Sequence, residues 1–269
     1  MNSKDDKFFD SCVHPTLNGS WTAGRSGIAF HELAAFKQRT PGYKALAIGL
    51  PGVGGYEHLA FKRECDTWGF EAIAAITTLE PMKTEREFEA ISDLGFRGVK
   101  IHPRLLGSNR DLDYLSRIFS LCDEFGLVCL LCTYEADVPG QLPTTDPYYQ
   151  ICEALNNVPS VRLILMHGGG SRLLQFAALS RHSETILLDL SFTIVDEMTR
   201  ALDPSIRDLM MKLDQRICVG SDSPEFDVMQ VLERIRDIAG NLNFKKLENI
   251  LSNNLERFFP TLTQRQVPR

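Results

Sequence analysis

The sequence contains no stretch of roughly 18 consecutive apolar residues, the length that a membrane-spanning helix needs. Its opening, MNSKDDKFFD, has no apolar core of the kind found in signal peptides. Basic residues are outnumbered, because 29 lysines and arginines face 35 aspartates and glutamates and leave a net charge of −6. Proteins that hold nucleic acid through its phosphates carry the opposite excess. We therefore expect neither a membrane nor a nucleic acid among the partners.

The sequence also lacks a disulfide framework. Its seven cysteines are an odd number and are scattered through apolar segments instead of loops, which predicts reduced thiols in the cytoplasm. Four of them, Cys65, Cys122, Cys152 and Cys218, are expected to be small core residues. With 43% hydrophobic and 24% charged residues, the 269-residue chain has the composition of a globular protein.

Eight short apolar segments alternate with segments of helical periodicity along the chain. The apolar segments are residues 8–14, 45–50, 70–77, 98–102, 127–133, 161–167, 185–191 and 216–222. The helical segments include 56–68, 85–94, 112–125, 148–156, 171–180, 194–213, 225–238 and 244–259. This alternation predicts an α/β fold, a closed (β/α)₈ TIM barrel in a single domain of residues 1–269, with an extra C-terminal helix. The alternative is an open, doubly wound sheet with helices on both faces.

Ionisable residues stand where most of these predicted strands end. In a (β/α)₈ barrel the active site gathers at the C-terminal ends of the strands, so these residues are expected to share one rim. They are Asp10, Cys12 and His14 on the first strand, Lys100, His102 and Arg104 on the fourth, Cys132 on the fifth, His167 on the sixth, Asp189 on the seventh and Asp222 on the eighth. So many polar strand ends indicate a functional site.

The first strand offers two metal donors in a Cys-x-His pattern. Because side chains alternate along a strand, Asp10, Cys12 and His14 are expected to point the same way. Cys12 and His14 could then bind one metal ion, with further donors from strands five, six and eight. The alternative is a buried cysteine beside a histidine with a structural role.

Two other strand ends have competing interpretations. His167 precedes three glycines, which would let a ligand approach the backbone, although a histidine at a tight turn needs no ligand. Asp222, in Ser-Asp-Ser-Pro, either faces the rim or caps the next helix.

The glycine-rich run at 49–55 matches no phosphate-binding loop and is interpreted as a loop over the site, with Tyr56 and His58 as possible substrate contacts.

Six segments in order, FFDSCVHP, GFRGVKIHPR, GLVCLLCTYE, VRLILMHGGG, ICVGSDSPEF and NNLERFF, resemble the amidohydrolase superfamily. The resemblance is to the branch containing aminocarboxymuconate-semialdehyde decarboxylase. It implies one divalent metal, usually zinc, bound by residues at the positions of Cys12, His14, Cys132 and Asp222. It also implies an acid/base or polarising role for His167, and a homodimer.

Two of these positions depart from the family pattern. Cys12 and Cys132 stand where the family has histidines, and both replace imidazole with a thiol that can also bind zinc. The alternative is that the metal site has been lost and the thiols only fill space. The assignment of Cys132 further depends on strand register, because a shift by one residue would turn Cys129 and Thr133 inward instead.

The resemblance implies a metal-dependent hydrolase acting on a small polar or carboxylated substrate, such as a lactone or amide. Asp222 would then collect a proton from the attacking water, and His167 would stabilise the developing oxyanion. Lys100, His102 and Arg104 form a positive cluster suited to a carboxylate or phosphate, unless they merely pair with acidic residues at the rim. Two alternatives remain open: a non-oxidative decarboxylase using the same site, and a metal-free barrel that binds a ligand or partner.

Overall fold

A computed structural model describes residues 7–107, 112–134 and 145–260. Eight parallel strands pair with one another in the order in which they follow in the sequence. They are β1 (Phe8–Val13), β4 (Tyr43–Ile48), β5 (Glu71–Ala75), β6 (Gly98–Ile101), β7 (Val128–Cys132), β8 (Leu163–Met166), β9 (Ile186–Asp189) and β10 (Ile217–Cys218). All eight predicted strands are confirmed. The doubly wound alternative is wrong, because its strand order would reverse partway through the sheet.

The first and last strands meet and close the sheet into a barrel. The amide of Ser11 donates to the carbonyl of Val219 (3.1 Å), and the amide of Asp222 donates to the carbonyl of Cys12 (2.8 Å). A third bond runs from the amide of His14 to the carbonyl of Ser223 (2.8 Å). These bonds continue past the end of β10, so the segment that carries Asp222 lies directly against the end of β1.

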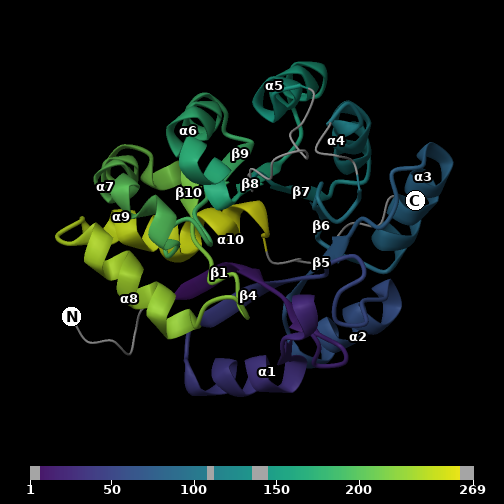
Figure 1. The fold of residues 1–269 in the computed structure, drawn as a ribbon, viewed down its shortest axis with the longest axis horizontal. Coiled ribbons are helices and arrows are strands. Elements are labelled where there is room, and N and C mark those ends of the chain that lie inside the picture. The colour runs from purple at the N-terminus through teal and green to yellow at the C-terminus, as the bar shows by residue number, and fades with distance from the viewer. Residues whose placement is uncertain (1–6, 108–111, 135–144, 261–269) are drawn as a thin grey trace.

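Helices surround the barrel (Figure 1). They are α1 (Phe30–Arg39), α2 (His58–Trp68), α3 (Pro81–Asp93), α4 (Leu115–Glu124), α5 (Pro147–Asn157), α6 (Leu173–His182), α7 (Asp203–Lys212) and α8 (Val228–Ala239). The predicted helix at 194–213 is divided into a 3-10 helix, Glu197–Leu202, and α7, which has Pro204 in its first turn. None of the helices in the described ranges has the length and apolar composition needed to cross a membrane.

Helix α1 and the small β2–β3 pair (Pro15–Thr16 and Ile28–Ala29) were not predicted from the sequence. Helix α1 buries only Phe30, Leu33 and Ala34, so its apolar face is too narrow to give a clear helical period. Strands β2 and β3 have two residues each and contain no periodic pattern that could be detected.

Two apolar cores lie on either side of the barrel wall. The inner core contains Val128 and Leu130 of β7, whereas Cys129 and Leu131 of the same strand belong to the outer core between strands and helices. Side chains alternate along a strand, so Cys132 also faces the barrel interior. The shifted register, which would have turned Cys129 inward, is therefore excluded.

The C-terminal segment closes the end of the barrel where the strands begin. It runs through α9 (Phe244–Glu248), a π-helical turn (Asn249–Asn253) and α10 (Asn254–Phe258), which together confirm the predicted terminal helix. Leu255, Phe258 and Phe259 pack into the inner core. The C-terminal segment thus fills the barrel interior at this end, and the ionisable strand ends lie at the opposite end.

Asn254 fastens this segment to the barrel. Its side-chain amide is fully buried and donates to the carbonyls of Asp214 (2.7 Å) and Ile217 (2.6 Å). Replacing Asn254 with alanine leaves both carbonyls without this donor. We expect the free energy of unfolding to fall by about 2–4 kcal/mol, because each unsatisfied buried group costs roughly 1–3 kcal/mol.

The neighbouring Asn253→Ala variant is the matched control for denaturation in urea. Asn253 is only half-buried and donates to the side chain of Asn249 at 3.2 Å. Its loss should cost less than about 1 kcal/mol. Equal losses in the two variants would show that Asn254 does not fasten the segment.

Candidate functional site

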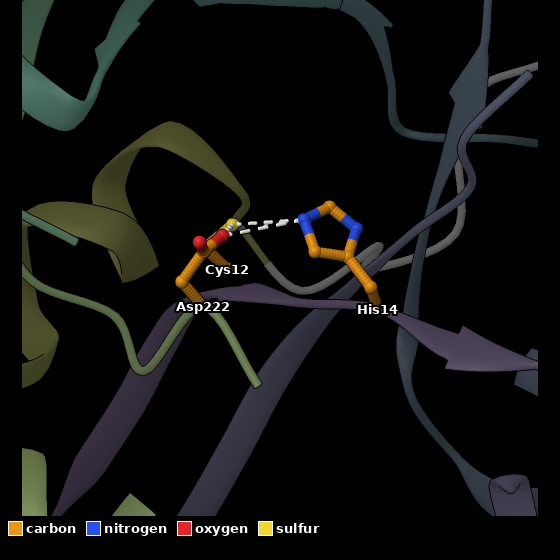
Figure 2. Close-up of side chains that lie close together, drawn as sticks. All are labelled: Cys12, His14 and Asp222. Carbon is orange, nitrogen blue, oxygen red and sulfur yellow. Dashed lines mark hydrogen bonds and ion pairs between the residues drawn. The ribbon is translucent and has the colours of Figure 1, made fainter. Parts of the chain in front are cut away.

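Three predicted metal ligands meet at the open end of the barrel (Figure 2). Cys12 Sγ lies 3.4 Å from His14 Nε2 and 3.1 Å from Asp222 Oδ1, and the last two atoms are 3.4 Å apart. All three side chains are buried. Within the described part of the chain, this is the one group of three or more metal-ligating side chains whose donor atoms lie within 4.8 Å of one another.

The histidine of this cluster is held in the orientation that a metal ligand requires. His14 Nδ1 lies 2.9 Å from the carbonyl oxygen of Ile48, so this nitrogen carries the proton and donates it. The lone pair of the ring is then on Nε2, which faces Cys12 and Asp222. The ring of Trp21 packs beside that of His14, with centroids 5.6 Å apart.

The expectation that Asp10 would point the same way as Cys12 is wrong. The pairing of β1 with β4 shifts between Asp10 and Val13, and this irregularity breaks the alternation of side chains. The Asp10 carboxylate instead accepts hydrogen bonds from the Tyr43 hydroxyl (3.1 Å) and the Ser221 amide (2.8 Å). Asp10 therefore joins β1, β4 and the end of β10 instead of reaching the metal cluster.

Asp222 is not a helix cap. Helix α8 is capped by Asp227, whose Oδ1 accepts from the amides of Met229 (2.9 Å) and Gln230 (3.2 Å). Asp222 adopts a left-handed backbone conformation with φ of 55°, which turns its side chain toward Cys12 and His14. The interpretation in which Asp222 faces the rim is therefore correct.

The surroundings of the cluster raise the pKa of its thiol, Cys12, and lower the pKa of its carboxylate, Asp222. Burial raises the pKa of the Cys12 thiol well above its ordinary value, and the nearby charge of Asp222 raises it further. Burial alone would also raise the pKa of Asp222, but the charge of His167 and the interaction with His14 outweigh it and hold that pKa below its usual range. Asp222 is therefore ionised at neutral pH.

A buried hydrogen-bond network positions His167. Its backbone amide donates to Asp189 Oδ2 (3.0 Å), and its Nδ1 lies 3.1 Å from the carbonyl oxygen of Ser191. The hydroxyls of Ser191 and Ser11 both donate to the same Asp189 carboxylate. With Nδ1 facing this network, the other ring nitrogen is available to the site. Asp189 thus positions His167 and is not itself a ligand of the cluster.

The glycines after His167 have a different role from the one predicted. A Cβ on Gly169 would lie 2.1 Å from the ring of Phe176, and one on Gly168 would lie 3.0 Å from Leu173. These glycines let α6 pack closely against the end of β8, so they do not open the backbone to a ligand.

Burial lowers the pKa of His167, but the charge of Asp222 and the interaction with Cys132 outweigh it and raise that pKa overall.

Lys100, His102 and Arg104 lie on the same cleft as the metal cluster. The lining of this cleft includes His14, Lys100, His102, Arg104, His167 and Asp222. Lys100 is 1% exposed, and among the described residues its Nζ has no hydrogen-bond partner. Arg104 is exposed and donates to the carbonyl of Tyr134 (2.7 Å). Lys100 forms no salt bridge with any residue that the structure describes, so pairing with acidic residues at the rim does not explain this member of the cluster.

Cys132 lies outside the cluster of Cys12, His14 and Asp222. Its thiol instead interacts with the imidazoles of His102 and His167. The structure thus places Cys132 in the barrel interior, as predicted, but beside two histidines and not within the group of potential ligands.

Two predicted substrate contacts have structural roles instead. The Tyr56 hydroxyl accepts a hydrogen bond from the amide of Ala75 (2.8 Å), which holds the ring against the barrel wall. His58 Nε2 lies 3.4 Å from Glu87 Oε1, and neither Tyr56 nor His58 lines the cleft. Tyr56 and His58 follow a glycine-rich loop, but this place in the sequence did not bring their side chains to the cleft.

Sequence reasoning missed Trp21 and Glu225, which both line the cleft. Trp21 Nε1 donates to Glu225 Oε1 (2.7 Å), and the Arg25 guanidinium donates to both oxygens of Glu225. These contacts fasten the segment that contains Trp21 to the end of the barrel beside Asp222. A tryptophan among small polar residues, in NGSWTAGRSG, was the signal that could have indicated it.

The donor set fits a divalent metal of the zinc type. Zinc is bound at about 2.0–2.3 Å by imidazole, thiolate and carboxylate, so tetrahedral ligands lie roughly 3.3–3.8 Å apart. The three donor–donor distances of 3.1–3.4 Å are close to that spacing. Three protein donors leave a fourth position for water or substrate, which is the arrangement of catalytic zinc sites.

The sequence matches the family described as amidohydrolase over residues 34–260. The chain therefore belongs to the amidohydrolase family and is an enzyme. The match begins after Cys12 and His14, so it does not include these two residues of the candidate metal site. No protein of curated function matches the sequence.

Solved structures with the same fold include three informative neighbours. An uncharacterized TIM-barrel protein from Bordetella bronchiseptica has a TM-score of 0.75 and 16% identity, over 94% of this chain and 98% of that one. A probable 2-pyrone-4,6-dicarboxylic acid hydrolase from Acinetobacter baumannii has a TM-score of 0.67 and 13% identity, over 94% and 99%. A dihydroorotase from Campylobacter jejuni has a TM-score of 0.64 and 12% identity, over 94% and 83%. At these identities the likeness establishes a shared fold.

Proposed function

We propose that this enzyme is a metal-dependent hydrolase that cleaves a lactone, amide or similar bond in a small carboxylated substrate. The observation that carries the proposal is that one cleft contains both the His14–Asp222 end of the metal cluster and the unpartnered ammonium group of Lys100. A buried cation without a partner destabilises a protein unless a ligand supplies the partner. A substrate carboxylate has the charge and size to do so.

Cys12, His14 and Asp222 are the proposed ligands of the metal. When bound, a zinc ion supplies a water molecule that is nucleophilic at neutral pH and polarises the carbonyl group of the substrate. His14 already has the required tautomer, because its Nδ1 donates to Ile48. The Cys12 thiol would have to lose its proton to bind the metal, because only a thiolate is a ligand, and a cation held between them would offset the repulsion between this thiolate and the Asp222 carboxylate.

Asp222 and His167 are the proposed catalytic residues. Asp222 is ionised, so its carboxylate can accept the proton that the attacking water loses. His167 has a raised pKa, which favours the protonated ring as a donor to the oxyanion that forms on the substrate. Its bond to the carbonyl of Ser191 holds the ring in place, so little reorganisation is needed during the reaction.

Lys100, His102 and Arg104 are proposed to hold the substrate carboxylate. Lys100 lies deepest, whereas Arg104 lies at the exposed edge of the same cleft. The structural neighbour from Acinetobacter baumannii, a probable dicarboxylic acid hydrolase, contains citric acid. A tricarboxylate bound to the same fold supports the choice of a carboxylated substrate and makes citrate a practical probe.

The first test is the metal content of the protein purified under reductant, without chelators or a metal-binding tag. We expect about one zinc per chain, as for other sites with three protein ligands. The Cys12→Ala variant should lose the zinc, whereas Cys132→Ala should keep it. Loss from both variants would restore the four-ligand prediction that includes Cys132. A wild-type protein that holds no stoichiometric metal, even after zinc is added, would leave the metal-free barrel as the better interpretation.

The reaction type is tested separately, with a panel of carboxylated lactones, amides and unsaturated acids. Release of a new acid group without CO₂ supports hydrolysis. Release of CO₂ instead would show that the enzyme is a decarboxylase using the same residues.

A further inference from the structure

A short segment between β2 and β3, residues 17–27, lies at the open end of the barrel beside the metal cluster. We call this segment the strap. It places the ring of Trp21 beside that of His14, with centroids 5.6 Å apart, and both residues line the substrate cleft. Trp21 is only half-buried, so part of its ring is open to a molecule in the cleft. The strap therefore forms one wall of the cleft, next to a proposed metal ligand.

Backbone hydrogen bonds give the strap a defined shape. The amide of Trp21 donates to the carbonyl of Arg25 (2.8 Å), which closes the tip of the strap on itself. At the base, the amide of Leu17 donates to the carbonyl of Gly54 (2.9 Å). Neither bond ties the tip around Trp21 to the strands of the barrel.

The carboxylate of Glu225 makes that connection. Trp21 Nε1 donates to Glu225 Oε1 (2.7 Å), and the guanidinium of Arg25 donates to both carboxylate oxygens. Glu225 follows Asp222 closely in the chain, and its amide donates to the carbonyl of Asp222 (2.9 Å). Among the described residues, Glu225 is the one partner outside the strap to which the side chains of Trp21 and Arg25 donate.

We infer that Glu225 is a positioning residue that strengthens substrate binding by holding Trp21 as a fixed wall of the cleft. This inference rests on the proposed function, because it takes the cleft to be the substrate site. A side chain that is already in place loses little conformational freedom when a ligand binds, so such preorganisation raises affinity. Without the carboxylate, the indole N–H of Trp21 loses its acceptor, and the strap keeps only its internal bonds and its base.

Other contacts hold the metal cluster in place, so Glu225 acts on the substrate and not on the metal. His14 Nδ1 donates to the carbonyl of Ile48 (2.9 Å), and the amide of Asp222 donates to the carbonyl of Cys12 (2.8 Å). Neither bond involves Glu225. Its removal should therefore weaken substrate binding and leave zinc binding unchanged.

Fluorescence of Trp21 measures its position directly, in metal-free protein that carries Trp68→Phe. The sequence has two tryptophans, and Trp68 ends α2 at the end of the barrel where the strands begin, so Trp21 remains as the one reporter. Citrate should lower the quenching of Trp21 by neutral acrylamide at least about twofold, because a bound molecule covers the ring. Glu225→Ala should raise the quenching without citrate about twofold, since a segment with fewer bonds opens more often. Absence of either effect would overturn the inference.

A double-mutant cycle determines whether Glu225 acts through Trp21. Calorimetric titration with citrate compares Glu225→Ala, Trp21→Phe and the double variant, all metal-free. Each single variant should bind citrate about tenfold more weakly, because the wall is no longer preorganised. The double variant should lose far less than the roughly 100-fold product expected for independent residues, since both changes break the same tie. A full 100-fold loss would show that Glu225 acts without Trp21 and would refute the inference.

Two further variants serve as controls. Glu256→Gln removes a carboxylate that pairs with Lys44 (2.8 Å) at the opposite end of the barrel, so it should bind citrate like the wild type. Glu225→Gln keeps an oxygen that can accept from Trp21, and it also replaces Glu225→Ala if that variant melts early. Its citrate affinity should stay within about threefold of the wild type, since a neutral hydrogen bond of this kind contributes roughly 1 kcal/mol. A tenfold loss in this folded variant would show that the charge, and not the bond to Trp21, decides affinity.

Zinc content keeps this inference distinct from the proposed function. Glu225→Ala should hold as much zinc as the wild type, and loss of zinc would mean that Glu225 supports the metal ligands instead of the substrate wall. A wild-type protein without zinc would count against the metal-dependent hydrolase alone, because fluorescence and citrate affinity are both measured on metal-free protein.

Discussion

Replacing Asp222 with asparagine is expected to abolish activity and to weaken zinc binding by at least about 100-fold, the upper range reported for losing even an outer partner of a metal ligand. Asparagine keeps the shape of the side chain and tolerates the left-handed backbone at this position, but it has no charge to offer the metal. Zinc stabilises the folded protein by mass action, so a 100-fold weaker affinity removes about 2.7 kcal/mol of that stabilisation. The melting temperature with and without zinc measures the loss.

The matched control is Asp227→Asn, five positions along the chain. Asp227 caps α8, and asparagine caps helices about as well as aspartate, so this variant should keep both its stability and its response to zinc. If Asp222→Asn and the wild-type protein gained the same stability from zinc, the cluster would not be the metal site.

Replacing Lys100 with methionine should stabilise the protein while it removes carboxylate binding. Methionine has nearly the same length and volume, and it leaves no unpartnered ammonium group inside the barrel. We expect the free energy of unfolding to rise by about 1–3 kcal/mol, the typical cost of an unsatisfied buried polar group. Citrate should bind at least about tenfold more weakly, since a hydrogen bond to a charged group contributes roughly 1.5–3 kcal/mol.

Calorimetric titration of metal-free protein measures the citrate affinity without competition for zinc. Lys44→Met is the control, because Lys44 is exposed, pairs with Glu256 at 2.8 Å and lies at the start of β4, the opposite end of the barrel from the cleft. Its affinity for citrate should equal that of the wild type. A Lys100→Met protein that is less stable and binds citrate normally would show that Lys100 supports the fold and not the substrate.

The fold was predictable because its periodic signal is strong. Each strand is buried on both faces, as the continuous apolar runs indicated, and the helices between them alternate regularly. What the sequence did not show was α1, whose buried residues are limited to Phe30, Leu33 and Ala34. The irregularity in β1 could not be predicted from the sequence either. The shift in pairing between Asp10 and Val13 changes which side of the strand each side chain points to, but it leaves no trace in the composition of the strand.

The candidate site was predictable residue by residue where a strand end fixed the position. His14, Lys100, His167 and Asp222 all line the cleft, and Cys12 completes the metal cluster. Trp21 and Glu225 could not be paired from the sequence, because they are 204 residues apart and no pattern links them. The neighbours of Cys132 were equally hidden, since the direction of a long histidine side chain depends on packing between strands and not on strand order.

Cys12 and Asp222 come from opposite ends of the chain, 210 residues apart, and touch only where the last strand docks on the first. During synthesis the N-terminal strand leaves the ribosome long before its partner exists. A nascent chain that has not yet reached Asp222 has one thiol and one imidazole but no complete ligand set. Metal capture at this site would therefore report that the last strand has docked on the first, and a chain cut before Asp222 would be unable to hold the ion.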